Sequence, residues 1–327
     1  VLARDDAGTP AASPAASEVD VALVEEFAQR AGIALAAAGL YAQQARTTAV
    51  LRRSLVQPPL PTVPGMSFGA VYRPADEGLL IGGDFYDVHP GEAPGSETMF
   101  LLGDVCGKGV EAAVSTGQVR QSVQALRRLE RDPVRLLELL NDTMLASARQ
   151  LDEDPRFVTL VLGTAIARPD GGLLLDVAGG GHLPPLVVRR GGGVEVVEIG
   201  GTLVGALPTA RIRRRRVELA PGEACVLYSD GVTEARGGPD GRRTFGEDRL
   251  ATLLTGSEIM PAAAIAERVA LHTTRWLTEG SHDDIAVLVV QAPLPTGPKG
   301  EARPGARRQH LHSVVPTAAT HAEEGRA

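Results

Sequence analysis

The sequence has few of the features that mark secreted or membrane-bound proteins. It contains only two cysteines, Cys106 and Cys225, which excludes a disulfide framework and favours a reducing cytoplasm. It has no run of about 18 consecutive apolar residues, so we predict no membrane span within this chain. Its first residues also lack the charged, apolar and small-residue pattern of a signal peptide.

Aromatic residues and lysines are scarce as well. Aromatic side chains make up 3% of the 327 residues, so aliphatic side chains and alanine must fill the core. Lys108 and Lys299 are the only lysines, the net charge is -7, and no basic face stands out. This composition argues against nucleic-acid binding, which needs a concentrated positive surface. The hydrophobic content of 43% suffices for one large domain or two modest domains.

Residues 1–56 are predicted to hold a short strand, a loop and one long helix. "VLARDD" (1–6) indicates the strand, and we expect it to be the end of a segment from a longer protein. Asp20 is a suitable N-cap, and the helix continues to about residue 56, where two prolines stop it. Its apolar positions recur at spacings of four and three. This fits either a weak, alanine-rich coiled coil or an ordinary amphipathic helix.

From Met66 onward, short apolar strands alternate with glycine and proline turns. Many short strands with few parallel crossovers indicate antiparallel sheets packed as a sandwich. Helices are predicted over residues 110–130, 133–150, 246–254 and 261–277, the first two as a pair. We therefore predict an α+β fold, an antiparallel β-sandwich flanked by helices, with an N-terminal signalling helix. The tail after Ala292 is rich in Pro, Gly and Arg and is expected to be disordered.

The charge run "RIRRRR" covers residues 211–216. On a strand, alternate residues of such a run face solvent, and charged residues on an edge strand resist aggregation. We favour this interpretation over a docking patch for an acidic partner.

Four aspartates share one setting, at the end or the start of an apolar strand. Asp84 follows "LLIGG", Asp104 follows "FLLG", Asp230 follows "CVLYS" and Asp283 opens "DDIAVLVV". Each one alone fits a structural turn better than a site, but four matching contexts favour a site. Carboxylates gathered at one edge of a sandwich stay ionised only if cations neutralise them. Their oxygens suit Mg²⁺ or Mn²⁺, and two such ions fit phosphoester hydrolysis by an activated water.

Two glycine-rich motifs are incomplete. "IGGDFYDV" (81–88) nearly spells the signature of the diguanylate cyclases, but Phe85 stands where the second acid is required. "GDVCGKG" (103–109) has the look of a phosphate loop, but Gly109 replaces its Ser or Thr. A helix beginning here, together with Lys108, could still favour an anion.

Two lone histidines lie in other glycine-rich or acidic segments. His282 adjoins Asp283 and is a candidate to orient it. His182, in "AGGGHLPP", is expected to fill a turn.

Seven segments, in order, carry a resemblance to a known family. They are "GGDFYDV", "LLGDVCGKGVEAA", "FVTLVLGTA", "AGGGHLPPLVV", "VLYSDGVTEA", "FGEDRL" and "HDDIAVLVV". Together they resemble the bacterial SpoIIE-like branch of the PPM metal-dependent serine/threonine phosphatases over about residues 57 to 292. The resemblance implies a β-sandwich flanked by helices and a centre of two Mn²⁺ or Mg²⁺ ions. It also implies direct attack of a metal-activated water on the phosphate.

The resemblance further implies a role for each catalytic acid. Asp84 and Asp104 would be metal ligands, with Asp104 bridging both ions, and the backbone carbonyl of Val105 would bind one ion. Asp230 and Asp283 would complete the second site.

Asp284 and Asp87 are candidates to support these ligands. Two positions depart from the eukaryotic branch of the family. Cys106 stands where that branch has a candidate general-acid histidine, and "EGLLIGGD" has no counterpart of its phosphate-binding arginine. Lys108 is the remaining candidate for substrate binding.

By the same resemblance, four regions are expected. They are a C-terminal remnant of a GAF-like sensor domain with a loop (1–19), a helical linker (20–56), the phosphatase domain (57–292) and a disordered tail (293–327). Such linkers pass a signal to the phosphatase, and we expect a cytoplasmic homodimer formed through the N-terminal helix. The expected substrate is a phosphorylated STAS-domain anti-anti-sigma protein. The alternative is a phosphatase-like interaction module that binds a partner without turnover.

Overall fold

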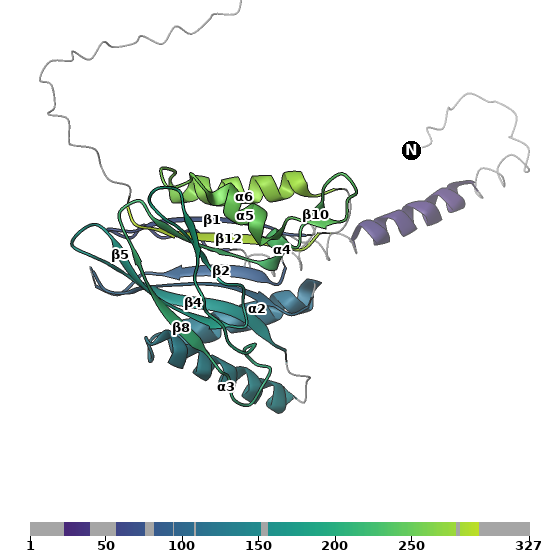
Figure 1. Ribbon diagram of the computed structural model, residues 1–327. Helices are drawn as coiled ribbons and strands as arrows, with labels where there is room; N and C mark the ends of the chain where they lie inside the picture. Colours follow the sequence, from purple (N-terminus) through teal and green to yellow (C-terminus); the bar gives the residue numbers. More distant parts are fainter. Residues whose placement is uncertain are drawn as a thin grey trace, which may run out of the picture. The chain divides into compact units, whose positions relative to one another are not determined.

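Two five-stranded antiparallel sheets pack face to face and form the body of the protein (Figure 1). The computed structural model describes residues 23–39, 57–75, 82–93, 95–107, 109–151, 156–278 and 282–293. The first sheet has the strand order β1 (Ser67–Arg73), β12 (Ile285–Gln291), β9 (Ala224–Tyr228), β6 (Leu186–Val188), β7 (Val194–Val196). The second has the order β2 (Asp84–His89), β3 (Thr98–Val105), β4 (Val158–Ala167), β5 (Leu173–Gly180), β8 (Arg213–Leu219). A small ribbon pairs β10 (Arg236–Gly237) with β11 (Arg243–Thr244).

Helices cover the outer face of each sheet (Figure 1). The first sheet carries α5 (Gly246–Leu254) and α6 (Ala262–Trp276), the second carries α2 (Gly109–Leu126) and α3 (Pro133–Leu151), and the short α4 (Asp230–Thr233) follows β9. The layers are therefore helix, sheet, sheet, helix, which confirms the predicted α+β sandwich. The helix bounds agree closely with those predicted, except that α2 ends at Leu126 rather than at residue 130.

The hydrophobic core has three parts, one between the sheets and one beneath each helical layer. We call the part between the sheets the inter-sheet core. On β3 it takes Phe100 and Leu102, whereas Leu101 and Val105 face α2 and α3. This alternation follows from the two-residue period of side chains along a strand. Because both faces of β3 are buried, its sequence is an almost continuous apolar run.

The residues at the start of α3 explain why a new helix begins there, after α2 has ended. Asp132 precedes the helix, and its Oδ1 accepts hydrogen bonds from the amides of Val134 and Arg135, both at 3.0 Å. Pro133 fits the first helical position because the amide it lacks would have had no partner there. The helix then buries Leu136, Leu137 and Leu140 against the second sheet.

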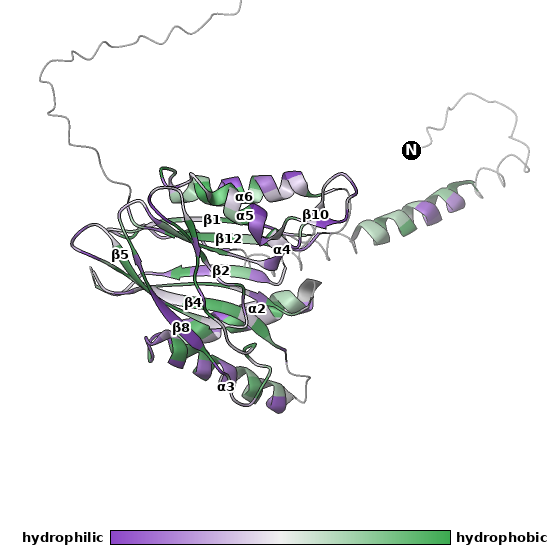
Figure 2. Cartoon of the chain, viewed as in Figure 1, coloured by the Kyte–Doolittle hydropathy of each residue, from purple (hydrophilic) through white to green (hydrophobic). Residues whose placement is uncertain are grey.

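The arginine run lies on β8, the outer strand of the second sheet. Its residues 213–216 are exposed, whereas Val217 and Leu219 enter the inter-sheet core. Figure 2 shows the strand in purple, in contrast to the green strands of the interior. Arg214 forms ion pairs with Asp132 and Asp176. The predicted solvated edge strand is therefore confirmed.

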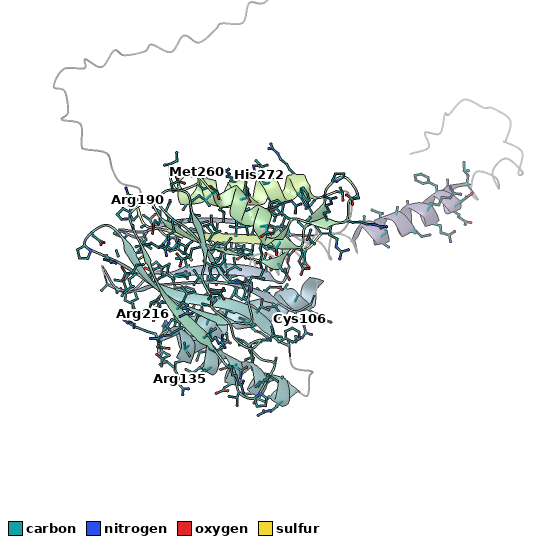
Figure 3. The ribbon with its side chains drawn as sticks, in the orientation of Figure 1. Cys106, Arg135, Arg190, Arg216, Met260 and His272 are labelled. Carbon is teal, nitrogen blue, oxygen red and sulfur yellow. The ribbon has the colours of Figure 1, made fainter. Side chains whose placement is uncertain are left out.

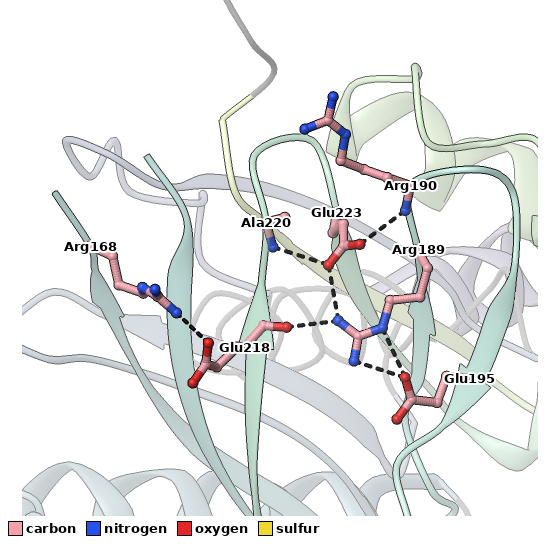
Figure 4. A network of polar contacts seen from close by, with 7 residues as sticks. All are labelled: Arg168, Arg189, Arg190, Glu195, Glu218, Ala220 and Glu223. Atoms are coloured by element: carbon pink, nitrogen blue, oxygen red, sulfur yellow. Dashed lines mark hydrogen bonds and ion pairs between the residues drawn. The ribbon is translucent and has the colours of Figure 1, made fainter. Parts of the chain in front are cut away.

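An ion-pair network joins the edges of the two sheets at the start of β9 (Figure 4). Arg189, just after β6, contacts the Glu223 carboxylate at 2.9 Å and donates to the backbone carbonyl of Glu218 on β8 at 2.7 Å. The Glu223 carboxylate also accepts hydrogen bonds from the amides of Arg190 and Ala220, both at 3.0 Å. Burial raises the pKa of Glu223, but these hydrogen bonds and the Arg189 charge outweigh it and hold the pKa below its usual value.

A helix over residues 23–39 lies within the predicted linker, and its apolar side chains are largely exposed. Five of them have exposed fractions of 63% to 74%, namely Leu23, Val24, Phe27, Ile33 and Leu35. No described helix is long and apolar enough to cross a membrane. The proposed sensor remnant (1–19), the other linker residues and the tail from residue 294 lie outside the described residues.

Candidate metal centre

The second sheet carries two aspartates on one face and at one end. Asp84 is the first residue of β2, and Asp104 lies directly opposite it on β3. Tyr86 is an even number of residues from Asp84 on β2, and Phe100 is an even number of residues from Asp104 on β3. Both Tyr86 and Phe100 point into the inter-sheet core. Because strand side chains alternate between faces, both carboxylates lie on the face that meets the first sheet.

The first sheet brings its aspartates to the same end. Asp230 follows β9 and begins α4, while Asp283 and Asp284 directly precede β12, the antiparallel neighbour of β9. Ser229 joins the two segments, because its hydroxyl accepts a hydrogen bond from the Ala286 amide at 2.9 Å. The Asp284 amide donates to the Asp283 carboxylate at 2.9 Å.

The pKa values indicate that these carboxylates form one cluster. Burial, and then the Asp104 charge, raise the pKa of Asp84 well above its usual value. Burial, and then the charges of Asp230, Asp283 and Asp284, together raise the pKa of Asp104 to about 7. Burial and the Asp283 charge raise the pKa of Asp230 as well. The structure thus brings together the four aspartates singled out in the sequence, with Asp284 beside them. We call these five residues the acid cluster.

The cluster suits hard divalent cations by its chemistry. The Oδ2 atom of Asp84 is buried and has no hydrogen-bond partner among the described residues. Gly83 leaves the space beside it open, because a Cβ there would lie 2.5 Å from Asp104 Oδ1 and 2.6 Å from the Val105 carbonyl oxygen. Within the described residues, no three acidic, histidine or cysteine side chains already form a complete cage. The carboxylate and carbonyl oxygens gathered here are nevertheless of the kind that Mg²⁺ and Mn²⁺ prefer as ligands.

Asp284 connects the cluster to the segment that follows β1. Its Oδ1 accepts a hydrogen bond from the Ala75 amide at 2.7 Å, and its Oδ2 lies 3.5 Å from the Tyr72 hydroxyl. Burial, and then the Asp284 charge, raise the pKa of Tyr72, so that its hydroxyl stays protonated as a donor. Asp284 therefore holds the backbone that follows β1 beside the other four acids, and the supporting role expected for it stays a prediction.

Asp87 lies outside the cluster, contrary to the expectation that it supports the ligands. Its side chain points to the opposite face of β2, where Arg120 of α2 donates two hydrogen bonds to the carboxylate at 2.7 and 3.0 Å. The pair anchors α2 to the edge strand of the second sheet. This contact could not be predicted from the sequence because the two residues are 33 positions apart.

The other candidates have different settings. The Nδ1 atom of His282 lies 2.9 Å from the backbone carbonyl oxygen of Asp283. Cys106 is exposed at the surface near the start of α2 (Figure 3), and its amide donates to the Phe157 carbonyl. Lys108, the candidate for substrate binding, lies outside the described residues.

Two polar side chains near the cluster were not identified as functional from the sequence. Gln57 donates from Nε2 to the Asp84 carbonyl at 3.1 Å and accepts the Tyr86 amide at 3.2 Å. His182 contacts Thr159 and the Tyr228 carbonyl at 2.7 and 3.1 Å. Beyond the turn-filling role expected for it, the His182 ring thus joins β4 to the end of β9. The glycine run at 179–181 was the available signal for these contacts of His182. Its residues lack side chains, so the chain can pass close to neighbouring segments just before His182.

Comparisons with known proteins agree with this architecture. The model of the family described as stage II sporulation protein E (SpoIIE) matches residues 94–293. Protein IcfG of Synechocystis sp. is 27% identical over 222 residues, which cover 61% of this chain and 33% of IcfG. The chain thus spans about a third of the length of that curated relative.

Solved structures show the same fold. The RsbU and RsbW domains of Rv1364c from Mycobacterium tuberculosis align with 26% identity and a TM-score of 0.58, over 73% of this chain and 63% of that one. The PP2C domain of SiaA from Pseudomonas aeruginosa aligns with 21% identity and a TM-score of 0.62, over 78% and 98%. The PP2C phosphatase domain of SpoIIE from Bacillus subtilis, with a fragment of its regulatory domain, aligns with 19% identity and a TM-score of 0.56. The alignment covers 71% of this chain and 64% of that one.

Proposed function

The chain belongs to the SpoIIE family of serine/threonine protein phosphatases, and on this premise we propose that residues 57–292 form its metal-dependent catalytic domain. The proposed reaction is hydrolysis of phosphoserine on a partner protein with two Mn²⁺ or Mg²⁺ ions. One observation carries the proposal: both sheets deliver aspartates, of which Asp84 and Asp284 are buried, to the same end of the inter-sheet core. Carboxylates that raise one another's pKa in this way are typical of cation-binding and catalytic sites.

Each ligand has a distinct part in this proposal. Asp104, which faces both Asp84 and the acids of the first sheet, would bridge the two ions. Asp84 and the Val105 carbonyl would hold one ion, and Asp230 and Asp283 would hold the other. When bound, the ions supply a polarised water for in-line attack on phosphorus and offset the developing charge, with no phosphoenzyme.

The remaining residues would orient this set. Asp284 holds the Ala75 amide and approaches the Tyr72 hydroxyl, which fixes the wall of the site on the side of β1. Lys108 stays a candidate to contact the phosphate, since it directly precedes α2 in the sequence.

We propose a phosphorylated STAS-domain anti-anti-sigma protein as the substrate. The support is the likeness, at 26% identity, to the structure that contains the RsbU and RsbW domains of Rv1364c. The family resemblance of the seven sequence segments supports the same substrate class. We also propose that the protein acts in the cytoplasm.

The regions outside the catalytic domain have proposed roles as well. Residues 20–56 would form a linker that joins two chains in a homodimer, and the exposed apolar side chains of the helix over 23–39 support this. A hydrophobic helix face of this kind gains stability when a second copy covers it. Residues 1–19 would be the end of a GAF-like sensor domain, and residues 293–327 a disordered tail.

A silent interaction module is the second candidate. Two observations favour it: the acids do not form a complete cage within the described residues, and Cys106 replaces the general-acid histidine of the eukaryotic branch. Such a module would bind the STAS protein and leave its phosphate intact.

Mn²⁺-dependent hydrolysis distinguishes these candidates. We expect the protein to hydrolyse p-nitrophenyl phosphate and to remove phosphate from one of the phosphorylated STAS proteins of the same genome. Asp230→Asn should lower both rates by at least about 100-fold, because it removes a ligand that offsets transition-state charge. The matched control is Asp240→Asn, an exposed acid in the loop between β10 and β11. Equal, negligible rates for the wild type and Asp230→Asn would reject the enzyme and leave the interaction module.

A further inference from the structure

The acid cluster is divided between two sheets, and no strand pairing connects these sheets within the described part of the chain. Asp84 and Asp104 belong to the second sheet, whereas Asp230 and Asp283 flank strands of the first. Their like charges push these halves apart, while a pair of metal ions needs them at a fixed separation. Contacts that join the sheets at this end, together with the packing of the inter-sheet core, therefore determine the separation of the two halves.

His182 makes such a contact. It follows β5, and its ring lies between Thr159 of β4 and the backbone carbonyl of Tyr228, at 2.7 and 3.1 Å. Thr159 is the direct cross-strand partner of Asp104. Tyr228 is the last residue of β9, two positions before Asp230.

The partners of the ring define its hydrogen-bonding state. The Tyr228 carbonyl can only accept, so Nε2 carries the proton and donates to it. Nδ1 is then an acceptor, and the Thr159 hydroxyl donates to it. Both ring nitrogens are occupied in this arrangement. The ring is therefore directed at the two sheets and is not available as a metal ligand.

We propose that His182 is a positioning residue that holds the Asp230 half of the acid cluster at a fixed distance from the Asp104 half. This inference rests on the proposed metal-dependent function. It assigns a role to the hydrogen bonds of His182 with Thr159 and Tyr228: they keep the two sets of metal ligands at a fixed separation. Residues that orient metal ligands typically change metal affinity or activity by about 10- to 100-fold when they are removed.

The test compares His182→Ala, Thr159→Val and the double variant with the wild type. We expect Mn²⁺ affinity, measured by calorimetry on folded protein, to fall by about 10-fold or more in His182→Ala. Thr159→Val should show a smaller loss. The double variant should be no weaker than His182→Ala, because both changes break one chain of contacts. The matched control is Thr164→Val, a buried threonine on the same strand β4, whose affinity should equal that of the wild type.

A purely structural role predicts a different result. In that case thermal stability would fall in His182→Ala while the Mn²⁺ affinity of the folded protein stayed that of the wild type, and the proposal would be overturned. Additive losses in the double variant would also contradict it.

Amide hydrogen exchange of the metal-free protein separates this inference from the proposed function. We expect His182→Ala to accelerate exchange in residues 229–233 while leaving α3 unchanged. If the wild type binds no Mn²⁺, the proposed function fails, and the exchange result alone decides whether His182 holds the two sheets. Unchanged exchange in residues 229–233 would overturn the positioning role whatever the metal result.

Discussion

Asp84 and Asp104 stand directly opposite each other on β2 and β3, with both carboxylates on the face that meets the other sheet. Like charges in this position destabilise a sheet, and burial adds to the cost. Burial, and then the Asp104 charge, raise the pKa of Asp84, whereas burial and the charges of Asp230, Asp283 and Asp284 raise the pKa of Asp104. A pair that lowers the stability of the fold in this way is expected at functional sites, where activity and stability are in opposition.

Asp84→Asn should therefore stabilise the metal-free protein and abolish its response to metal. We expect the free energy of unfolding without metal to rise by about 1 kcal/mol, because the change removes the opposed charge. For a domain of this size, the melting temperature should rise by about 2–4 °C. Mn²⁺ should then no longer raise the melting temperature, and phosphatase activity should fall by at least about 100-fold.

Thermal unfolding with and without Mn²⁺ measures both effects, with Asp240→Asn as the control for loss of an acid elsewhere. The interpretation is wrong if Asp84→Asn lowers stability without metal and still binds Mn²⁺ like the wild type.

Gln57 offers a second prediction, because its side chain occupies the open edge of β2. Its amide pairs with the backbone of Asp84 and Tyr86, as a neighbouring strand would. Gln57→Ala should free these groups and loosen the start of β2. We expect a loss of about 1–2 kcal/mol in stability for the two hydrogen bonds. Because Asp84 loses a fixed backbone, Mn²⁺ affinity should also fall by about 10-fold.

Hydrogen exchange at the Tyr86 amide and an Mn²⁺ titration measure these effects. The matched control is Gln124→Ala, an exposed glutamine of α2. Unaltered protection of the Tyr86 amide in Gln57→Ala would show that the side chain does not hold the strand edge.

Much of the fold could be predicted because its signals are local. The apolar runs around Phe100 and Val287 indicated strands, and Pro133 marked the start of a helix that the structure places at that residue. The acids at strand ends were equally visible, because a carboxylate beside glycine or serine at the end of an apolar run is a feature of neighbouring residues.

The partners of polar side chains could not be predicted in the same way. His182 lies 23 positions from Thr159 and 46 from Tyr228, and Asp87 lies 33 from Arg120. These contacts depend on the strand order and on which face of each strand meets which layer. The order β1-β12-β9-β6-β7 joins strands far apart in the chain, and the local sequence of a strand does not specify its neighbours.

The Asp87–Arg120 ion pair leads to a third prediction, which contrasts with that for Asp84. Asp87 is buried, so Arg120→Met leaves an uncompensated charge beneath α2. We expect a loss of about 3–5 kcal/mol in stability, measured by urea denaturation. The double variant Asp87→Leu with Arg120→Met should recover most of this loss, because both charges are then removed.

Mn²⁺ affinity separates the two aspartates of β2. The folded double variant should bind Mn²⁺ like the wild type, because Asp87 lies on the opposite face of the strand from Asp84. A double variant that stays folded but loses Mn²⁺ would instead make Asp87 part of the metal centre.

His182 should make the stability of the protein fall on acidification. Burial lowers the pKa of His182 to about 4, compared with about 6.5 in an unfolded chain. Between these values the unfolded chain binds a proton that the folded protein does not, so stability is lost as the pH falls through this window. The contribution is complete above the unfolded value and amounts to at most about 3 kcal/mol.

Urea denaturation of the wild type and His182→Gln from about pH 7 to about pH 4 tests this, because the glutamine does not titrate. At neutral pH the variant should be less stable than the wild type, since glutamine cannot reach both Thr159 and the Tyr228 carbonyl. The difference in the free energy of unfolding between the wild type and His182→Gln should shrink steadily on acidification, because only the wild type loses the His182 contribution. The control is His272→Gln, which removes an exposed histidine from α6 (Figure 3). A constant stability difference between the wild type and His182→Gln across this range would mean that His182 does not have its lowered pKa in the folded protein.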